Sequence, residues 1–282
     1  MHSTRRGFLC LTAASAALPA LSKLASAEAY PSRPVQVVVP YPPGGPADII
    51  ARPLCAALSE RLGASFVTEY KPGAGSNIGT ELVVRSRADG YTLLLASSAQ
   101  AINATLYGQL DYNFIRDTAP VASVSREALV LLGSSTLPAK TVSELIAYAK
   151  ANPGSVMMGS AGNGTTGHIA GELFQMMAAI HMIHVPYRGG PPALNALLGG
   201  QIQVLFTPVS GAIELVRAGR LPALAVTTAG RLAALPDLPT VAETVQGYEA
   251  SYWNGIVAPK GTPANIVAKL TARLTRHLVL RR

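Results

Sequence analysis

The sequence is poor in charged residues and in cysteine. Aspartate, glutamate, lysine and arginine make up 13% of the 282 residues, and they form no like-charge run that could serve as an interaction tail. Low-complexity tracts and repeats of fixed period are also missing, which argues against disordered and solenoid architectures. What is present is an apolar fraction of 49%, enough for a buried core in one large or two modest domains.

The N-terminus carries a predicted export signal. Residues 4–9 form a twin-arginine pattern, and the apolar stretch over residues 9–21 is too short to span a bilayer. Small residues at 25–27 are typical of a signal-peptidase site, so we expect a signal peptide over residues 1–27 and a protein that acts in the periplasm. Cys55 is then the only cysteine, which excludes an intrachain disulfide, and its apolar helical surroundings predict a core position.

The remaining charge is weakly basic and dispersed. Cleavage would remove Arg5, Arg6 and Lys23 and no acid, which lowers the formal net charge of +8 by three, to +5. No basic stripe with interleaved aromatic residues is present, so the excess suits a small anionic ligand better than nucleic acid.

Strand and helix signals alternate along the mature sequence. Apolar or β-branched strands are predicted over residues 35–39, 66–70, 91–96, 128–132, 181–185, 202–206 and 224–226. Each is followed by a helical pattern or a turn, which indicates an α/β fold with mostly parallel sheets that helices cover on both faces. The segment over residues 253–259 is expected to be rich in turns and to return to the first half of the molecule.

The alternation restarts after about Val121, which predicts two lobes. We expect lobe 1 to comprise residues 28–126 and 228–282, and lobe 2 to comprise residues 127–227. Hinges would then lie near the two crossings between the lobes.

Four turns between a strand and a helix are small and rich in N–H or hydroxyl groups. They cover residues 42–48, 73–80, 159–168 and 187–191, two in each lobe. Such turns let several backbone N–H groups converge on an anion, helped by the positive end of the helix dipole. Because ligands bind at the carboxyl ends of strands in open α/β sheets, we expect these turns to surround one carboxylate-binding cleft. The alternative is that all four are only tight turns, which any α/β protein needs.

The third turn also has the spacing of a dinucleotide-binding loop, Gly162-x-Gly164-x-x-Gly167. The acid that would hold the ribose about 20 residues further on is missing, and Arg188 lies near that position. Because arginine could accept a 2′-phosphate, an exported NADP-dependent oxidoreductase stays open as an alternative. The first strand leads instead to PYPPGGPAD, which lacks the spacing.

Other chemistry finds little support in the sequence. No Gly-x-Ser-x-Gly elbow occurs, and His181 and His184 would point to opposite faces of a strand, which is poor geometry for zinc. We therefore expect no catalysis, no cofactor and no metal. His168, at a helix start, is expected to orient a loop or the ligand, with a core histidine as the alternative.

Several segments resemble the successive signatures of one family. They are VVVPYPPGGPADIIARPL, KPGAGSNIGTELVVRSRADGYTLLLAS, GSAGNGTTGHIAGELF, VPYRGGPPALNALLGGQIQVLF, LPDLPTVAETV and YWNGIVAPKGTP. From about Pro34 to Pro263 the chain is similar to the Bug-type solute receptors of tripartite tricarboxylate transporters. These receptors continue for some tens of residues beyond the position of Pro263, so we expect this chain to be shortened at its C-terminus.

The resemblance implies a two-lobed periplasmic-binding-protein fold of type II with the ligand cleft between the lobes. A monomer would close on a small carboxylate, such as a di- or tricarboxylate, an amino acid or an aromatic acid. It would then present this ligand to a membrane permease. A carboxylate receptor that signals to a sensor kinase is the alternative.

The resemblance also implies which residues contact the ligand, through loop N–H groups, hydroxyls and bridging waters more than through a salt bridge. In the first lobe these are Tyr41, Gly44, Gly45, Asp48, Ser76, Asn77, Ser97 and Ser98. In the second lobe these are Gly164, Thr165, Thr166, His168, Tyr187, Arg188, Gly189 and Thr207. We expect the Asp48 carboxylate to cap its helix or orient the loop, because it would repel an anion.

Overall fold

The computed structural model describes the backbone of residues 30–279 and the side chains up to residue 274. The predicted signal peptide over residues 1–27 lies outside the described residues. The chain divides into an N-terminal unit, Met1–Ser32, and a large unit, Arg33–Arg282, whose fold is given below. Within the described residues, no helix has the length and apolar character that a bilayer crossing needs.

The first lobe is built on the parallel strands β1, β2 and β3, with β1 between the other two. Its elements in chain order are β1 (Val35–Val39), α2 (Pro46–Leu62), β2 (Phe66–Tyr70), η1 (Ala74–Ser76), α3 (Asn77–Val84), β3 (Thr92–Ser97), α4 (Ser98–Leu106) and α5 (Phe114–Asp117). The apolar strands β1 and β3 are almost wholly buried. The predicted core position of Cys55 on α2 is confirmed, and burial raises the pKa of its thiol to about 11.

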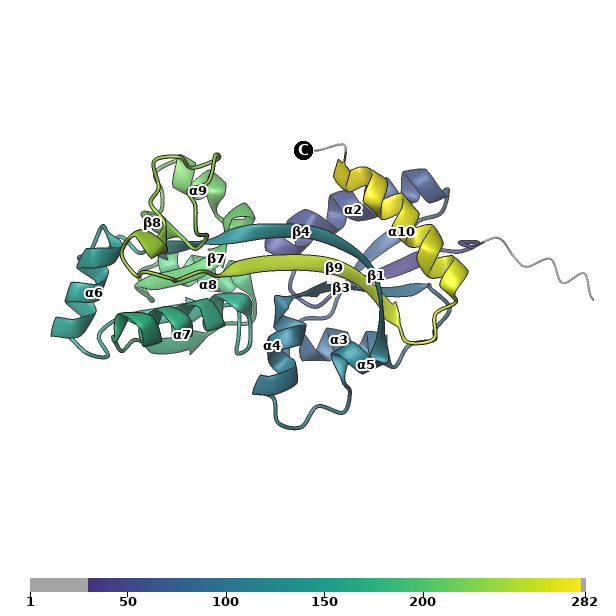
Figure 1. The fold of residues 1–282 in the computed structure, drawn as a ribbon, viewed down its shortest axis with the longest axis horizontal. Coiled ribbons are helices and arrows are strands. Elements are labelled where there is room, and N and C mark those ends of the chain that lie inside the picture. Colours follow the sequence, from purple (N-terminus) through teal and green to yellow (C-terminus); the bar gives the residue numbers. More distant parts are fainter. Residues whose placement is uncertain (1–29, 280–282) are drawn as a thin grey trace, which may run out of the picture. The chain divides into compact units, whose positions relative to one another are not determined.

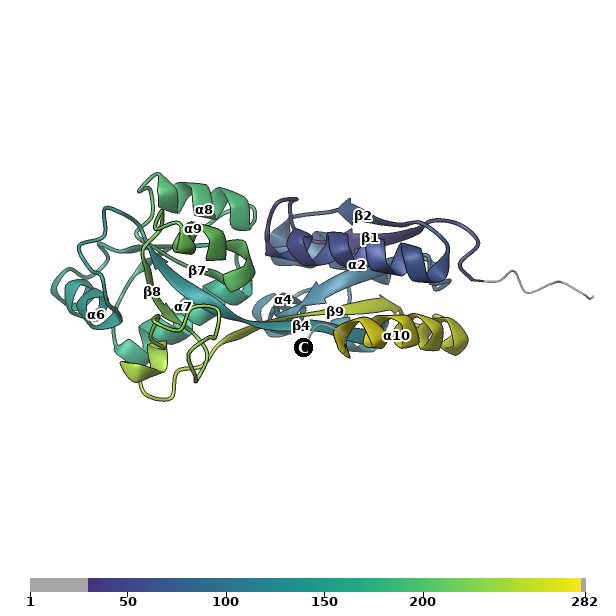
Figure 2. The same cartoon turned by 90° about the horizontal axis from the view of Figure 1, so that it is seen from above.

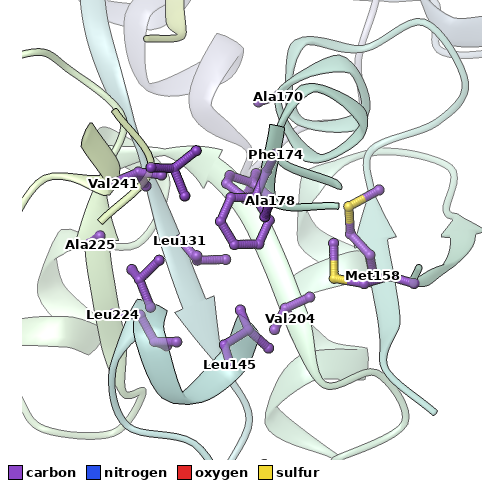
Figure 3. Packing of buried hydrophobic residues seen from close by; sticks show 14 of the residues in the cluster. Leu131, Leu145, Met158, Ala170, Phe174, Ala178, Val204, Leu224, Ala225 and Val241 are labelled. Atoms are coloured by element: carbon purple, nitrogen blue, oxygen red, sulfur yellow. The ribbon is translucent and has the colours of Figure 1, made fainter. Parts of the chain in front are cut away.

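The second lobe repeats the pattern with β5 between the parallel strands β6 and β7. Its elements are α6 (Val142–Ala151), β5 (Met157–Ser160), α7 (Thr166–Ala178), β6 (Ile183–Pro186), α8 (Gly190–Leu198), β7 (Val204–Pro208), η2 (Val209–Gly211), α9 (Ile213–Arg217) and β8 (Ala223–Val226). Phe174 of α7 packs with Leu131, Met158 and Val204 in the core of this lobe (Figure 3).

Two long strands connect the lobes. β4 (Thr118–Gly133) pairs with β9 (Ser251–Pro259) over its first part and with β7 over its last, in both cases antiparallel (Figure 1). The resulting order is β2-β1-β3-β9-β4-β7-β5-β6, with β8 also paired to β4. The predicted two-lobed α/β architecture is therefore confirmed. Only residues 128–132 of β4 were predicted as a strand, and the antiparallel connection through β4 and β9 was not predicted.

The expectation of turns over residues 253–259 is wrong, because this segment is most of β9. Asn254 and Gly255 suggest a turn in the sequence, but both are buried inside the sheet. The Asn254 side chain donates a hydrogen bond to Ser125 Oγ at 3.2 Å. At Gly255 an added Cβ would lie 3.0 Å from the Ala122 carbonyl oxygen. The register of β4 is irregular there, and its close approach favours glycine over a residue with a side chain.

The C-terminal part contributes to both lobes. Val241 of η3 (Val241–Glu243), Val245 and Tyr248 pack in the core of the second lobe. These residues follow the predicted boundary at residue 228, and the lobe boundaries stay a prediction. Helix α10 (Ala264–Val279) then lies along β4 and also contacts α2 (Figure 2).

Candidate ligand-binding site

The four predicted turns line two adjoining cavities between the lobes. Cavity A is lined by residues of the turn after β1, of the turns before α7 and α8, and of the end of β7, together with Tyr252. Cavity B is lined by the turn after β2, by Gly162 and Asn163, and by the turn after β6. Tyr41, Pro42 and Ala161 line both cavities. The carboxyl ends of strands from both lobes thus meet at one place.

Helices that begin at the cavities lack side-chain caps. Gly45, Thr165 and Gly189, the N-cap residues of α2, α7 and α8, make no capping hydrogen bond through a side chain. Helices α4 and α6, by contrast, are capped by Ser97 and Thr141. The first N–H groups of a helix have no partner within the helix, and the positive ends of three helix dipoles begin at cavity A. Pro46 of α2 and Pro191 and Pro192 of α8 have no N–H, so these two starts offer fewer donors than the start of α7 does.

The turn after β1 is held in shape by Asp48. Its carboxylate accepts hydrogen bonds from Gly44 N–H at 2.8 Å, Arg52 Nε at 2.8 Å and the Tyr70 hydroxyl at 2.6 Å. Burial alone would raise the pKa of Asp48, but the bonds from Arg52, Tyr70 and Gly44 outweigh it and lower the pKa. The carboxylate lines neither cavity, and it orients the loop as expected.

The glycine turn of the second lobe is held by Ser160 and Thr165. Gly162 N–H donates to Ser160 Oγ at 3.1 Å, and Thr165 Oγ1 donates to the Gly162 carbonyl at 2.7 Å. Ser160 Oγ is also 2.7 Å from His184 Nε2. Ser160 was not predicted as a site residue, although its position at the end of the strand, directly before the turn, was a signal for it.

Two stacked histidines lie behind the same turn. Gly164 N–H donates to His168 Nδ1 at 3.2 Å, and the rings of His168 and His184 stack at 4.0 Å. Burial lowers the pKa of both rings, that of His184 to about 4 with a further contribution from His168. The pair is neutral at pH 7, with Nδ1 of His168 free to accept the backbone N–H.

Polar side chains of the first lobe form a hydrogen-bond network at cavity B, which Tyr41 and Ser76 line. Gln100 Nε2 donates to Ser76 Oγ at 3.1 Å, and the Tyr41 hydroxyl lies 3.2 Å from Ser97 Oγ. Asn103 Nδ2 donates to Asn77 Oδ1 at 2.9 Å. These bonds fix the turn after β2, and burial raises the pKa of Tyr41 so that its hydroxyl keeps its proton.

The predicted ligand residues therefore divide into two groups. Those that line cavity A or B are Tyr41, Gly45, Ser76, Thr165, Thr166, Tyr187, Arg188, Gly189 and Thr207. Those that lie beside or behind the lining are Gly44, Asp48, Asn77, Ser97, Ser98, Gly164 and His168. Tyr252 of β9 lines cavity A without having been predicted, because β9 was not predicted as a strand.

The lobes touch one another around the cavities. The Tyr107 hydroxyl donates to the Asn163 carbonyl at 3.3 Å. Glycines permit a close approach at two further points, since a Cβ on Gly75 would lie 2.1 Å from that carbonyl oxygen and a Cβ on Gly164 1.9 Å from Asn103 Oδ1. The structure thus has the lobes closed on each other.

Comparison with known proteins identifies the family. The model of the tripartite tricarboxylate transporter family receptor matches residues 50–279. The chain belongs to this family. BugT of Bordetella pertussis (strain Tohama I) is 40% identical over 260 residues, which are 90% of this chain and 78% of BugT. A protein from the tcbD-tcbE intergenic region of Pseudomonas sp. (strain P51) is 36% identical over 89% of this chain and 75% of its own length.

Solved structures of receptors agree with this assignment. Rpa4515 of R. palustris, solved with adipate, has a TM-score of 0.86 and 37% identity over 88% of this chain and 84% of its own. The periplasmic binding protein BugD has a TM-score of 0.84 and 35% identity over 88% and 84%. MatC of Rhodopseudomonas palustris, solved with malate, has a TM-score of 0.84 and 31% identity over 88% and 85%. The predicted Bug-type family and fold class are confirmed, and the chain is an extracytoplasmic solute receptor.

Proposed function

We propose that the protein binds a small carboxylate in the periplasm and delivers it, without catalysis, to the permease of a tripartite tricarboxylate transporter. The observation that carries this proposal is the set of uncapped helix starts from both lobes at cavity A. A carboxylate there would satisfy N–H donors of both lobes at once. A ligand that bridges the lobes stabilises the closed arrangement by its affinity for that state.

The donors around cavity A suit an anion that is held without a counter-charge. Each helix start stabilises a nearby negative charge by about 0.3–1 kcal/mol when exposed, and by up to about 2 kcal/mol when partly buried. The buried hydroxyls of Thr166 and Thr207 add neutral donors. We assign ligand contact to these two residues, to Tyr41 and to the turns on either side of cavities A and B.

The named ligands of two similar receptors support a carboxylate, since Rpa4515 was solved with adipate and MatC with malate. Family membership also favours a receptor over the NADP-dependent oxidoreductase considered from the glycine spacing. The residues behind the lining, Asp48 and His168 among them, would then keep the loops in the shape that ligand binding requires.

Calorimetry of the mature protein tests ligand binding. The panel comprises di- and tricarboxylates, amino acids and aromatic acids, and we expect at least one to bind with micromolar or tighter affinity. A protein that melts cooperatively yet binds nothing across the panel would contradict the proposal. Delivery is tested by uptake of the labelled ligand in cells that carry the permease with and without this receptor. Uptake that does not depend on the receptor would instead point to sensing.

A further inference from the structure

The two cavities differ in charge. None of the described residues that line cavity A is aspartate, glutamate, lysine, arginine or histidine. Its walls are made largely of apolar groups, among them Pro42, Pro191, Leu205 and Phe206. Cavity B has one charged residue in its described lining, Arg188. Since Tyr41 and Pro42 line both spaces, an uncharged chamber adjoins a cationic one.

The arginine is exposed and has no acidic partner in the described part of the chain. Other cations near the cavities are already used: Arg52 pairs with Asp48 and Lys71 with Glu69. A guanidinium presents a rigid fork of donors that matches a carboxylate, so an unpaired one at a cavity wall is suited to a second anionic group.

The backbone around Arg188 is well fixed. Tyr187 N–H donates to the Ser160 carbonyl at 2.9 Å, which ties the turn to β5. On the other side, Gly189 has a φ of 117°, and a Cβ there would lie 2.3 Å from Pro42 Cγ of the first lobe. Arg188 therefore belongs to a turn whose backbone is anchored on both sides at the lobe interface. Closure of the lobes positions this turn at cavity B.

We propose that Arg188 is the specificity-determining residue for a second anionic group, and that the ligand is a dianion with an uncharged, mostly apolar body. This inference rests on the proposed function. One carboxylate lies at the helix starts of cavity A, the body lies between the cavities, and the second carboxylate pairs with the guanidinium. Amino acids are disfavoured, because no described acid lines either cavity to pair with an ammonium group.

The test compares straight-chain dicarboxylates from succinate to suberate with monocarboxylates of the same length. Calorimetry measures both series on the wild type, on Arg188→Gln and on Arg220→Gln. Arg220 is a matched control, because it is an exposed arginine of the second lobe that lines neither cavity. Arg188→Gln should weaken the best dicarboxylate by about tenfold or more and leave the monocarboxylates nearly unchanged, while Arg220→Gln should change neither. Because Arg188 is exposed, added salt should also reduce the preference of the wild type for dicarboxylates.

Three results would overturn the inference and leave the proposed function standing. In the first, wild-type protein binds a monocarboxylate or an amino acid as tightly as the best dicarboxylate. In the second, Arg188→Gln weakens both series equally. In the third, it weakens neither. Folded protein that binds no carboxylate at all would instead overturn the proposed function, and the inference with it.

Discussion

The hydroxyl of Ser98, the first residue of α4, is hydrogen-bonded to the hydroxyl of Thr166, the first residue of α7 in the opposite lobe. Both side chains are buried. Thr166 lines cavity A and Ser98 does not, so the first-lobe serine holds its partner across the interface. A residue that was predicted to contact the ligand thus contacts the other lobe in the closed structure.

This hydrogen bond should contribute to ligand affinity through closure. We expect Ser98→Ala to weaken ligand binding by about 0.5–1.5 kcal/mol, or two- to twelvefold, because the bond exists only while the lobes touch. The measurement is a double-mutant cycle with Thr166→Val, followed by calorimetry. Losses that simply add in the double variant would show that the two hydroxyls act independently.

A methyl group placed between the lobes should hinder closure more strongly. A Cβ on Gly211 of η2 would lie 2.7 Å from Pro46 Cγ of α2 in the other lobe. We expect Gly211→Ala to weaken ligand binding by about 1–3 kcal/mol, the usual cost of overpacking, while the melting temperature without ligand changes little. Gly230→Ala is the control, since nothing lies within 4 Å of an added Cβ there. Equal affinities of the two variants would contradict a tight interface at Gly211.

Most of the fold could be predicted from the sequence because its parallel strands are apolar on both faces. Strand β1, for example, has the predicted bounds of residues 35–39. The connecting strands were harder to predict because they run between the lobes. Strand β4, for example, is partly exposed in its first part and buried in its last, so it shows no single apolar pattern. Only residues 128–132 of β4 were expected, since Arg126 and Glu127 interrupt the apolar pattern, and Gly255 made β9 resemble a turn.

The site was predictable as far as local turn chemistry reaches. Glycines before helices indicated where N–H donors gather, and the structure brings those turns to the same two cavities. The contacts between Ser160, His168 and His184 could not be predicted, because they depend on the register of β5 with β6 and on the start of α7. A strand histidine looks the same in the sequence whether its ring packs in a core or supports a loop.

The two histidines predict that acid loosens the second-lobe turn. Protonation of His168 would remove the acceptor of the Gly164 N–H. Two cationic rings with centroids 4.0 Å apart would also repel each other. Among the described residues, the one carboxylate paired with these rings is Glu172, whose Oε1 lies 3.7 Å from His168 Nε2. Both pKa values are lowered in the folded state, so the stability they contribute is complete above pH 6.5. It is lost as the pH falls from about 6.5 toward about 4. Thermal melts across this range should show the loss, and ligand affinity should fall with it.

A variant separates this effect from general acid destabilisation. The lowered pKa values of Asp48 and Glu243 matter only as the pH falls below the ordinary carboxyl range, near 4, so they contribute little slope above pH 5. His184→Gln should therefore reduce the change in melting temperature between pH 6.5 and pH 5. Imidazole pKa values at or above 6.5 in an NMR titration of the folded protein would contradict the prediction.

Removal of the Asp48 charge should disturb the first-lobe turn. Asp48→Asn keeps the shape of the side chain but cannot serve Gly44 N–H, Arg52 and Tyr70 as an ionised acceptor. We expect a loss of about 1–3 kcal/mol in the free energy of unfolding, measured by urea titration, together with weaker ligand binding. Glu214→Gln is the control, because its pair with Arg217 at 3.4 Å is exposed and should contribute less than about 1 kcal/mol. If Asp48→Asn cost no more than this surface change, the carboxylate would not be what holds the loop.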